Sequence, residues 1–200
     1  LFSAQVLALI GTGLLTVALG LLAYDIAGAD ASMVLGIALS IKMLAYVFLS
    51  PVLTTLARSL PPRAIMVGSD VVRALVAACL PWVDQTWQIY ILIFLLQASS
   101  ATFTPTFQAI IPEVLTDEED YTNAISLSRL AYDLEAVFSP MLAAALLTVV
   151  NYHVLFVGTL AGFVASAGLV LSTHLPQLPP VDSTQSFLGR LTQGVRVFWG

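Results

Sequence analysis

Six long apolar stretches fill this chain almost from end to end, and they constrain its fold more than any other feature. They run at about 4–24, 33–56, 64–82, 87–111, 123–149 and 152–173. Each is close to or above the roughly 20 residues that a helix needs to cross the hydrocarbon core of a bilayer. None shows the alternating pattern of a membrane β-barrel strand. The sequence therefore predicts an all-α, polytopic membrane protein with six transmembrane helices.

Composition excludes an ordinary soluble domain. Hydrophobic residues make up 58% of the 200 positions, charged residues 10%, and the mean hydropathy is +0.94. Soluble domains contain roughly 45–50% apolar and about 25% charged residues. The single cysteine, Cys79, has no partner in the chain, so disulfides play no part in the predicted fold.

The basic residues predict the orientation of the helices. Arg58 and Arg63 lie between the second and third apolar runs, and Arg190 and Arg196 follow the sixth. Under the positive-inside rule these regions are cytoplasmic, which places both ends of the chain in the cytoplasm. The acidic segment 116–120 is then a cytoplasmic loop as well, since acidic residues contribute little to orientation.

The two ends of the chain carry different signals. The first run lacks the charged leader and the small-residue cleavage site of a signal peptide, so we expect none. We expect residues 1–173 to form the six-helix bundle and residues 174–200 to form a cytoplasmic linker with a short amphipathic helix, a disordered tail being the alternative. Because the chain stops inside that helix, we expect it to be the first half of a longer protein. The helical spacing is carried by Leu188, Leu191, Val195 and Phe198.

Polar residues form one stripe on each of two apolar runs. In the first run, Gln5, Thr12 and Thr16 fall at i, i+7 and i+11. In the fourth, the stripe has positions i, i+3, i+7 and i+11. Such stripes either line a cavity inside the bundle or bond across tightly packed helices. The two glutamines favour a cavity for the fourth run, whose stripe consists of Gln97, Ser100, Thr104 and Gln108.

Charged residues within the apolar runs need a partner or water, because an isolated charge at the bilayer centre costs at least about 2.5–3.5 kcal/mol. Spacing predicts two ion pairs, Asp70 with Arg73 at i, i+3 and Arg129 with Asp133 at i, i+4. We interpret both as a gate or as a lock on the fold rather than as substrate contacts.

Glu135 cannot share the face of Asp133, because two residues correspond to about 200° around a helix. It either meets Lys42 from another helix or faces the cavity as a proton-binding carboxylate. Asp133, Glu135 and Lys42 are therefore candidates for a proton or substrate pathway, together with the two polar stripes.

Several short motifs then carry a resemblance to a known family. The chain resembles the N-terminal half of the major facilitator superfamily, in the branch of macrolide and siderophore exporters. The resemblance spans nearly the whole chain. The matching stretches are Ser50-Pro51, Leu56-Ala57, Arg63, Ser69-Asp70, Arg73-Ala74, Phe103-Thr104-Pro105, Gln108, Pro112-Glu113, Asn123-Ala124 and Ser139-Pro140.

The loop between the second and third helices departs from the family pattern. Thr54 stands where the family usually has a glycine, Arg58 stands where it has an aspartate, and Pro61-Pro62 interrupt the turn. The usual charge contact of this loop with the other half of the transporter is therefore in doubt. We expect Asp70 and Arg73 to serve as the gate instead, with Arg58 and Arg63 as further candidates.

The resemblance implies a fold and an activity. The fold would be two six-helix halves, each built of two inverted three-helix repeats, that rock about a central site lined by the first and fourth helices. The activity would be export of a hydrophobic or amphipathic small molecule in exchange for protons. Independently of the resemblance, the composition suggests a bacterial inner membrane. The expected partners are the substrate, protons, the lipid bilayer and a second six-helix half, or a second copy if the chain is complete.

Other functional classes fit the sequence less well. No phosphate-binding loop of the G-x-x-x-x-G-K-[ST] type is present, so we expect neither ATP nor another cofactor. We expect neither nucleic-acid binding nor a metal site, since His153 and His174 have no second ligand in reach by sequence. An intramembrane aspartyl protease would need a glycine-rich aspartate partner for Asp133, which is absent, so we expect no enzyme. A transport-inactive scaffold on the same fold remains the alternative.

Overall fold

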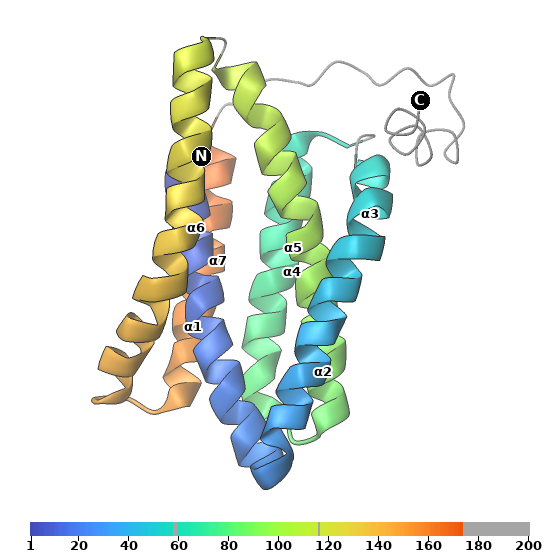
Figure 1. The fold of residues 1–200 in the computed structure, drawn as a ribbon, viewed down its shortest axis with the longest axis vertical. Coiled ribbons are helices and arrows are strands. Elements are labelled where there is room, and N and C mark those ends of the chain that lie inside the picture. The colour runs from blue at the N-terminus through green and yellow to red at the C-terminus, as the bar shows by residue number, and fades with distance from the viewer. Residues whose placement is uncertain (58–59, 116, 174–200) are drawn as a thin grey trace.

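A computed structural model describes residues 1–57, 60–115 and 117–173 of the chain (Figure 1). Within these residues every regular element is helical, which agrees with the predicted all-α class. The predicted amphipathic helix after residue 173 and the predicted gate residue Arg58 lie outside the described residues. The elements are α1 (Phe2–Ala27), η1 (Gly28–Asp30), α2 (Ala31–Leu44), the π-helical η2 (Ala45–Leu49), α3 (Ser50–Ala57), α4 (Pro62–Cys79), η3 (Leu80–Trp82), α5 (Thr86–Val114), α6 (Glu118–Leu147) and α7 (Tyr152–Ser172).

Five segments of the described chain are long and apolar enough to cross a membrane, and the first of them contains two of the expected helices. This segment, Phe2–Leu53, has 52 residues. A straight helix of that length would reach about 78 Å, far more than the roughly 30 Å of a hydrocarbon core. It folds back instead at η1, where Gly28 adopts a positive φ of 53° that other residues avoid. In the return limb, α2 packs against α1, whereas α3 packs against α5 (Figure 1), so the described residues make six passes.

The start of α6 differs from the predicted range. The sequence predicted a loop over 116–120 and a helix from 123, whereas the helix begins at Glu118. Asp117 caps it, because its carboxylate accepts hydrogen bonds from the backbone N–H groups of Glu119 at 2.9 Å and Asp120 at 3.4 Å. Three acidic residues occupy the first helical turn, where the helix dipole favours negative charge. The predicted loop is therefore wrong over 118–120, because these acidic residues stabilise the start of α6.

The packing of the helices repeats itself between the two halves of the chain. The first repeat consists of α1, α2 with α3, and α4, and the second consists of α5, α6 and α7. The first helix of each repeat packs against the other two helices of the opposite repeat: α1 against α6 and α7, and α5 against α2, α3 and α4. The two sets of contacts are therefore equivalent when one repeat is superposed on the other. The last helices of the two repeats, α4 and α7, pack against each other. This pattern agrees with two three-helix repeats.

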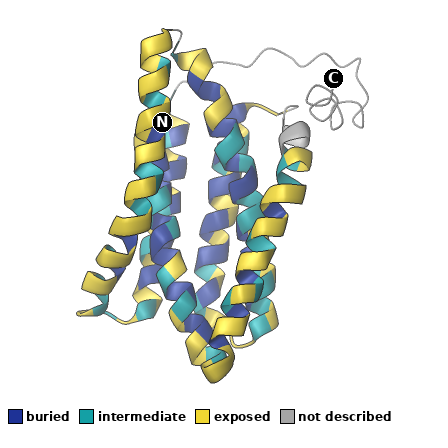
Figure 2. Ribbon diagram, viewed as in Figure 1, coloured by how far each residue is buried: buried dark blue, intermediate teal, exposed yellow. Residues whose placement is uncertain are grey.

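Burial separates an inner from an outer surface. Figure 2 shows buried residues where the helices face one another and exposed residues on the outside. The outer residues are largely apolar, as expected for a surface in contact with lipid or with another membrane domain. Helix α6 is much less buried than the others. Only 11% of its most apolar stretch is buried, against 39–50% for the other membrane-spanning segments.

Candidate functional site

A cavity of about 370 Å³ opens between five of the six passes. Most of its wall is apolar, with a few polar and charged side chains set into it. The lining residues are Gln5, Ala8, Leu9, Thr12, Leu15, Thr16, Leu19 and Gly20 from α1; Leu35, Ala38, Leu39 and Lys42 from α2; Tyr46 from η2; Arg73 from α4; Ile93, Leu96, Gln97, Ser100, Phe103 and Thr104 from α5; and Tyr132 and Glu135 from α6.

Both predicted polar stripes contribute residues to the cavity wall, but the stripe on α5 continues beyond the end of the cavity. Thr12 and Thr16 line it from α1, where each hydroxyl donates a hydrogen bond to a carbonyl four residues earlier, at 2.9 and 3.0 Å. From α5, the lining includes Gln97, Ser100 and Thr104. Gln108 is exposed and lies beyond the cavity. At 1.5 Å per residue it lies about 16 Å along the helix from Gln97, so the stripe outruns the space.

Two charged candidates face the same cavity from different helices. Lys42 on α2 and Glu135 on α6 are both half-buried in its wall, and the lysine charge acts on the carboxylate. Asp133 lies on the far side of α6, is exposed and does not line the cavity. Each residue turns a helix by 100°, so Glu135 and Asp133 point in nearly opposite directions. Glu135 therefore faces the inside of the bundle and Asp133 the outside.

Glu135 lies at a close contact between α6 and α1. A methyl group on Gly13 would stand 2.7 Å from Glu135 Oε1 and 2.1 Å from Ser139 Oγ, so only glycine fits at this position of α1. Ser139 is fully buried, and its hydroxyl has no hydrogen-bond partner in the described part of the chain. The side chain of Glu135 thus meets a backbone surface on one side and the open cavity on the other.

The predicted Asp70–Arg73 pair forms, and it is buried in the centre of the bundle. Arg73 donates from a terminal nitrogen to Asp70 at 2.5 Å. Ser166 of α7 donates to the second carboxylate oxygen at 2.7 Å. The guanidinium carbon lies 4.3 Å from the ring centre of Phe103 and 4.9 Å from that of Phe163, within range of cation–π attraction. One charged pair thereby connects α4, α5 and α7.

The second predicted pair does not form. Arg129 and Asp133 both lie in the described part of the chain, where they are exposed on α6 and form no ion pair with each other. The i, i+4 spacing brings the two side chains to one face of α6, but it does not bring their charged groups within ion-pair distance. Arg63 is exposed at the start of α4 and does not line the cavity.

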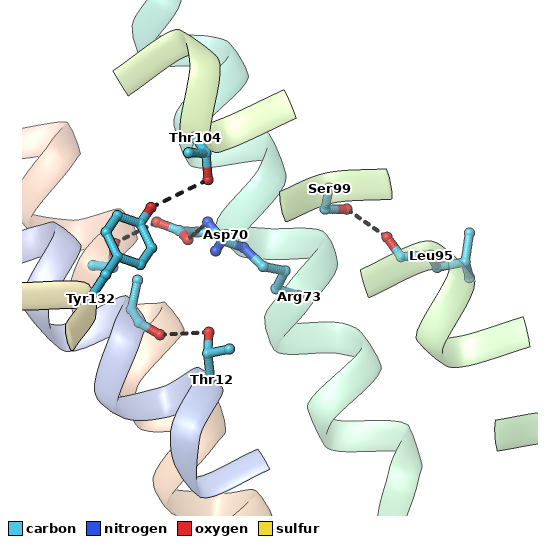
Figure 3. Close-up of polar contacts among 9 residues, drawn as sticks. Thr12, Asp70, Arg73, Leu95, Ser99, Thr104 and Tyr132 are labelled. Carbon is cyan, nitrogen blue, oxygen red and sulfur yellow. Dashed lines mark hydrogen bonds and ion pairs between the residues drawn. The ribbon is translucent and has the colours of Figure 1, made fainter. Parts of the chain in front are cut away.

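Two tyrosines on the cavity wall were missed by the sequence analysis. The hydroxyl of Tyr132 lies 3.5 Å from that of Thr104 (Figure 3). Tyr46 lies close to the same threonine. A third stripe on α6, with spacing i, i+4, i+7 and i+11, would have revealed Tyr132, since its members are the buried or half-buried residues of that helix face. They are Ser128, Tyr132, Glu135 and Ser139. Tyr46 has no such signal, because the π-helical turn that holds it interrupts the ordinary helical period.

Comparison with known proteins gives relatives of one kind. The chain is 25% identical to macrolide efflux protein A of Streptococcus pyogenes over 206 residues, covering 98% of this chain and 50% of that protein. It is 26% identical to macrolide efflux protein A of Enterococcus faecalis, over 83% of this chain and 53% of that protein. It is also 28% identical to the uncharacterized MFS-type transporter YfiS of Bacillus subtilis (strain 168), over 66% and 31%. The chain spans about half the length of the macrolide efflux proteins that it matches.

A family profile decides the assignment. The profile of the Major Facilitator Superfamily matches residues 1–200, which is the whole chain. The six apolar passes, the repeated packing of two helix triplets and the cavity between them are what that profile leads one to expect of half a transporter fold. This chain is a multi-pass membrane protein and belongs to the Major Facilitator Superfamily.

Proposed function

We propose that this chain is part of a secondary active transporter that exports a hydrophobic or amphipathic small molecule. The cavity is the observation that carries the proposal. Its volume of about 370 Å³ falls in the range of about 300–1,000 Å³ that is usual for small-molecule sites. Its apolar wall with few polar groups suits a molecule that has a large apolar body. Two relatives are named macrolide efflux proteins, which supports drug-like compounds as the first substrates to test.

Proton antiport is the proposed source of energy, and Glu135 is the proposed proton carrier. It is a half-buried carboxylate that faces the cavity and the cation of Lys42. An intramembrane carboxylate in a cavity is a position where a proton can be taken up on one side and released on the other. Alternating access, in which the cavity opens to one membrane face at a time, would couple that proton to the substrate.

Substitution of Glu135 tests the coupling. In everted vesicles that contain the native protein, Glu135→Gln should abolish uphill export driven by a pH gradient while downhill exchange of substrate continues, since the amide fills the same volume without titrating. Glu118→Gln on the same helix is the matched control, because Glu118 is exposed in the first turn of α6. If export by Glu135→Gln keeps the pH dependence of the unmodified protein, Glu135 does not carry the proton.

A second six-helix body is the proposed partner of the outer face of α6. Arg129 and Asp133 are exposed there among large apolar residues. Each charge would cost at least about 2.5–3.5 kcal/mol in lipid, so protein or water should cover it. When the remainder of the native protein is expressed separately, it should co-purify with this chain, and Arg129→Glu should weaken the association. Asp30→Lys, at the exposed turn between α1 and α2, is the control; failure of the two parts to associate contradicts the proposal.

The proposed location is a bacterial inner membrane, with both ends of the chain in the cytoplasm. Arg63 lies in the first turn of α4, which starts at the same end of the bundle as α6 with its acidic first turn (Figure 1). The role proposed throughout is transport rather than catalysis.

A further inference from the structure

Arg73 brings a guanidinium group to the wall of the cavity. Arg73 lines the cavity although only 4% of the residue is exposed. A guanidinium has five N–H groups and no acceptor. One terminal nitrogen donates to Asp70, and Nε has no partner in the described part of the chain. The rings of Phe103 and Phe163 cover the guanidinium, so further hydrogen bonds can form only in its plane.

Three hydroxyl groups gather beside this guanidinium, each from a different element. Tyr132 of α6 and Thr104 of α5 have their side-chain oxygens 3.5 Å apart (Figure 3). Tyr46 of η2 lies close to Thr104. Both tyrosines are near enough to Arg73 to interact with its charge. All four residues line the cavity. We call this group of Arg73, Tyr46, Thr104 and Tyr132 the Arg73 cluster.

The carboxylate that balances the charge of Arg73 does not face the cavity. Asp70 is completely buried, does not line the cavity, and accepts hydrogen bonds from Arg73 and from Ser166. The other charges in the wall, Lys42 and Glu135, act on each other. A molecule inside the cavity therefore meets a group in which every member can donate a hydrogen bond and in which no carboxylate is available to accept one.

We infer that the Arg73 cluster is a binding subsite for a hydrogen-bond-acceptor group of the exported molecule, namely a carbonyl, ester or carboxylate oxygen. The inference rests on the proposed function and concerns the same cavity. The acceptor would take hydrogen bonds from the hydroxyl groups beside the positive charge of Arg73, while the surrounding apolar wall holds the rest of the molecule. Asp70, Ser166 and the two phenylalanines hold Arg73 in place. The hydroxyl groups of Tyr46 and Tyr132 are therefore not needed to position it, and their neighbour Thr104 lines the cavity with them.

Two dyes that differ in a single acceptor group test the inference. Tetramethylrhodamine ethyl ester and tetramethylrosamine share one cationic ring system, and only the first carries an ester. Binding of each dye to the native protein, purified in detergent, is measured by fluorescence anisotropy. The unmodified protein should bind the ester dye more tightly. Tyr46→Phe and Tyr132→Phe should each raise the Kd of the ester dye about 2- to 10-fold, as expected for the loss of one hydrogen bond, and leave that of the rosamine within about twofold.

The controls separate a lost contact from a changed shape. Tyr24→Phe removes a hydroxyl from an exposed tyrosine outside the cavity and should change neither Kd. Equal weakening of both dyes by Tyr46→Phe or Tyr132→Phe would mean that the tyrosines only shape the cavity, and this overturns the inference. So does an unmodified protein that does not prefer the ester dye, or an ester-dye affinity that neither substitution lowers. Selective binding without export would leave the subsite in place and contradict the proposed function instead.

Discussion

The buried ion pair of Asp70 and Arg73 shows how a single residue pair can depend on its surroundings for its effect on stability. Asp70 is completely buried, and the side chain of Arg73 is 5% exposed. Removing both ions from water costs several kcal/mol each, which their attraction repays only with good geometry and additional hydrogen bonds. Ser166 supplies one such bond, and Phe103 and Phe163 flank the cation. The pair is therefore costly to break and less costly to replace as a whole.

This asymmetry gives a prediction at the residue scale. Asp70→Asn should lower the free energy of unfolding by about 3–5 kcal/mol, because it leaves the charge of Arg73 buried without a counter-ion. The double variant Asp70→Asn, Arg73→Met should lose less than that single variant, since it removes the unpaired charge too. Denaturant unfolding in detergent measures both. Asp84→Asn, at an exposed position, should stay within about 0.5 kcal/mol. Equal losses in the single and double variants would show that the charge is not the cause.

Between elements, the contact of α1 with α7 depends on glycine. A methyl group on Gly162 would lie 2.9 Å from the carbonyl oxygen of Leu7 and 3.2 Å from Cα of Gly11. Both are backbone atoms, which cannot turn aside as a side chain can. Thr159 adds a hydrogen bond from its hydroxyl to the carbonyl oxygen of Gly11 at 3.0 Å. Small residues at such a contact let two membrane helices approach closely enough for dispersion forces to hold them.

Two glycines of α7 should therefore respond in opposite directions to the same substitution. Gly162→Ala should lower the free energy of unfolding by about 1–3 kcal/mol, as overpacking does. Gly168→Ala should raise it by about 0.5–1 kcal/mol, because that position has open space and alanine loses less backbone entropy in a helix. Thermal unfolding of the two variants decides the matter. A stabilising Gly162→Ala would mean that α1 and α7 do not pack as closely as described.

The helices show which parts of this structure a sequence can predict. The thickness of the bilayer sets the length of an apolar run that crosses it, so the sequence alone predicts the membrane-spanning helices. Stripes such as that of Thr12 and Thr16 also identify an inner face, because polar groups avoid lipid. What a stripe cannot give is where the cavity ends, as Gln108 shows, or which helices face each other. The approach of Lys42 to Glu135 depends on the packing of several helices at once, and the sequence left it as one of two alternatives.

For the whole molecule, the two ends of the bundle differ in the residues they expose. Tyr24, Trp82 and Trp87 are exposed near the η1 and η3 turns, where aromatic side chains are typical of a membrane–water interface. The other end carries Arg63 and the acidic first turn of α6. Because α5 spans the bundle, Asp84 before it and Glu119 after it lie at opposite ends. The positive-inside rule predicts that the end with Arg63 faces the cytoplasm.

Cysteine labelling of intact cells tests this orientation. Cys79 is exposed and must first be replaced, by Cys79→Ser. In that background, a maleimide that cannot cross membranes should label Asp84→Cys from outside, and should label Glu119→Cys only after the cells are permeabilised. Each position is exposed, so a lack of labelling reports the membrane barrier rather than burial. The reverse result would invert the bundle relative to the proposed orientation. Labelling of both positions in intact cells would contradict the membrane crossing of α5 itself.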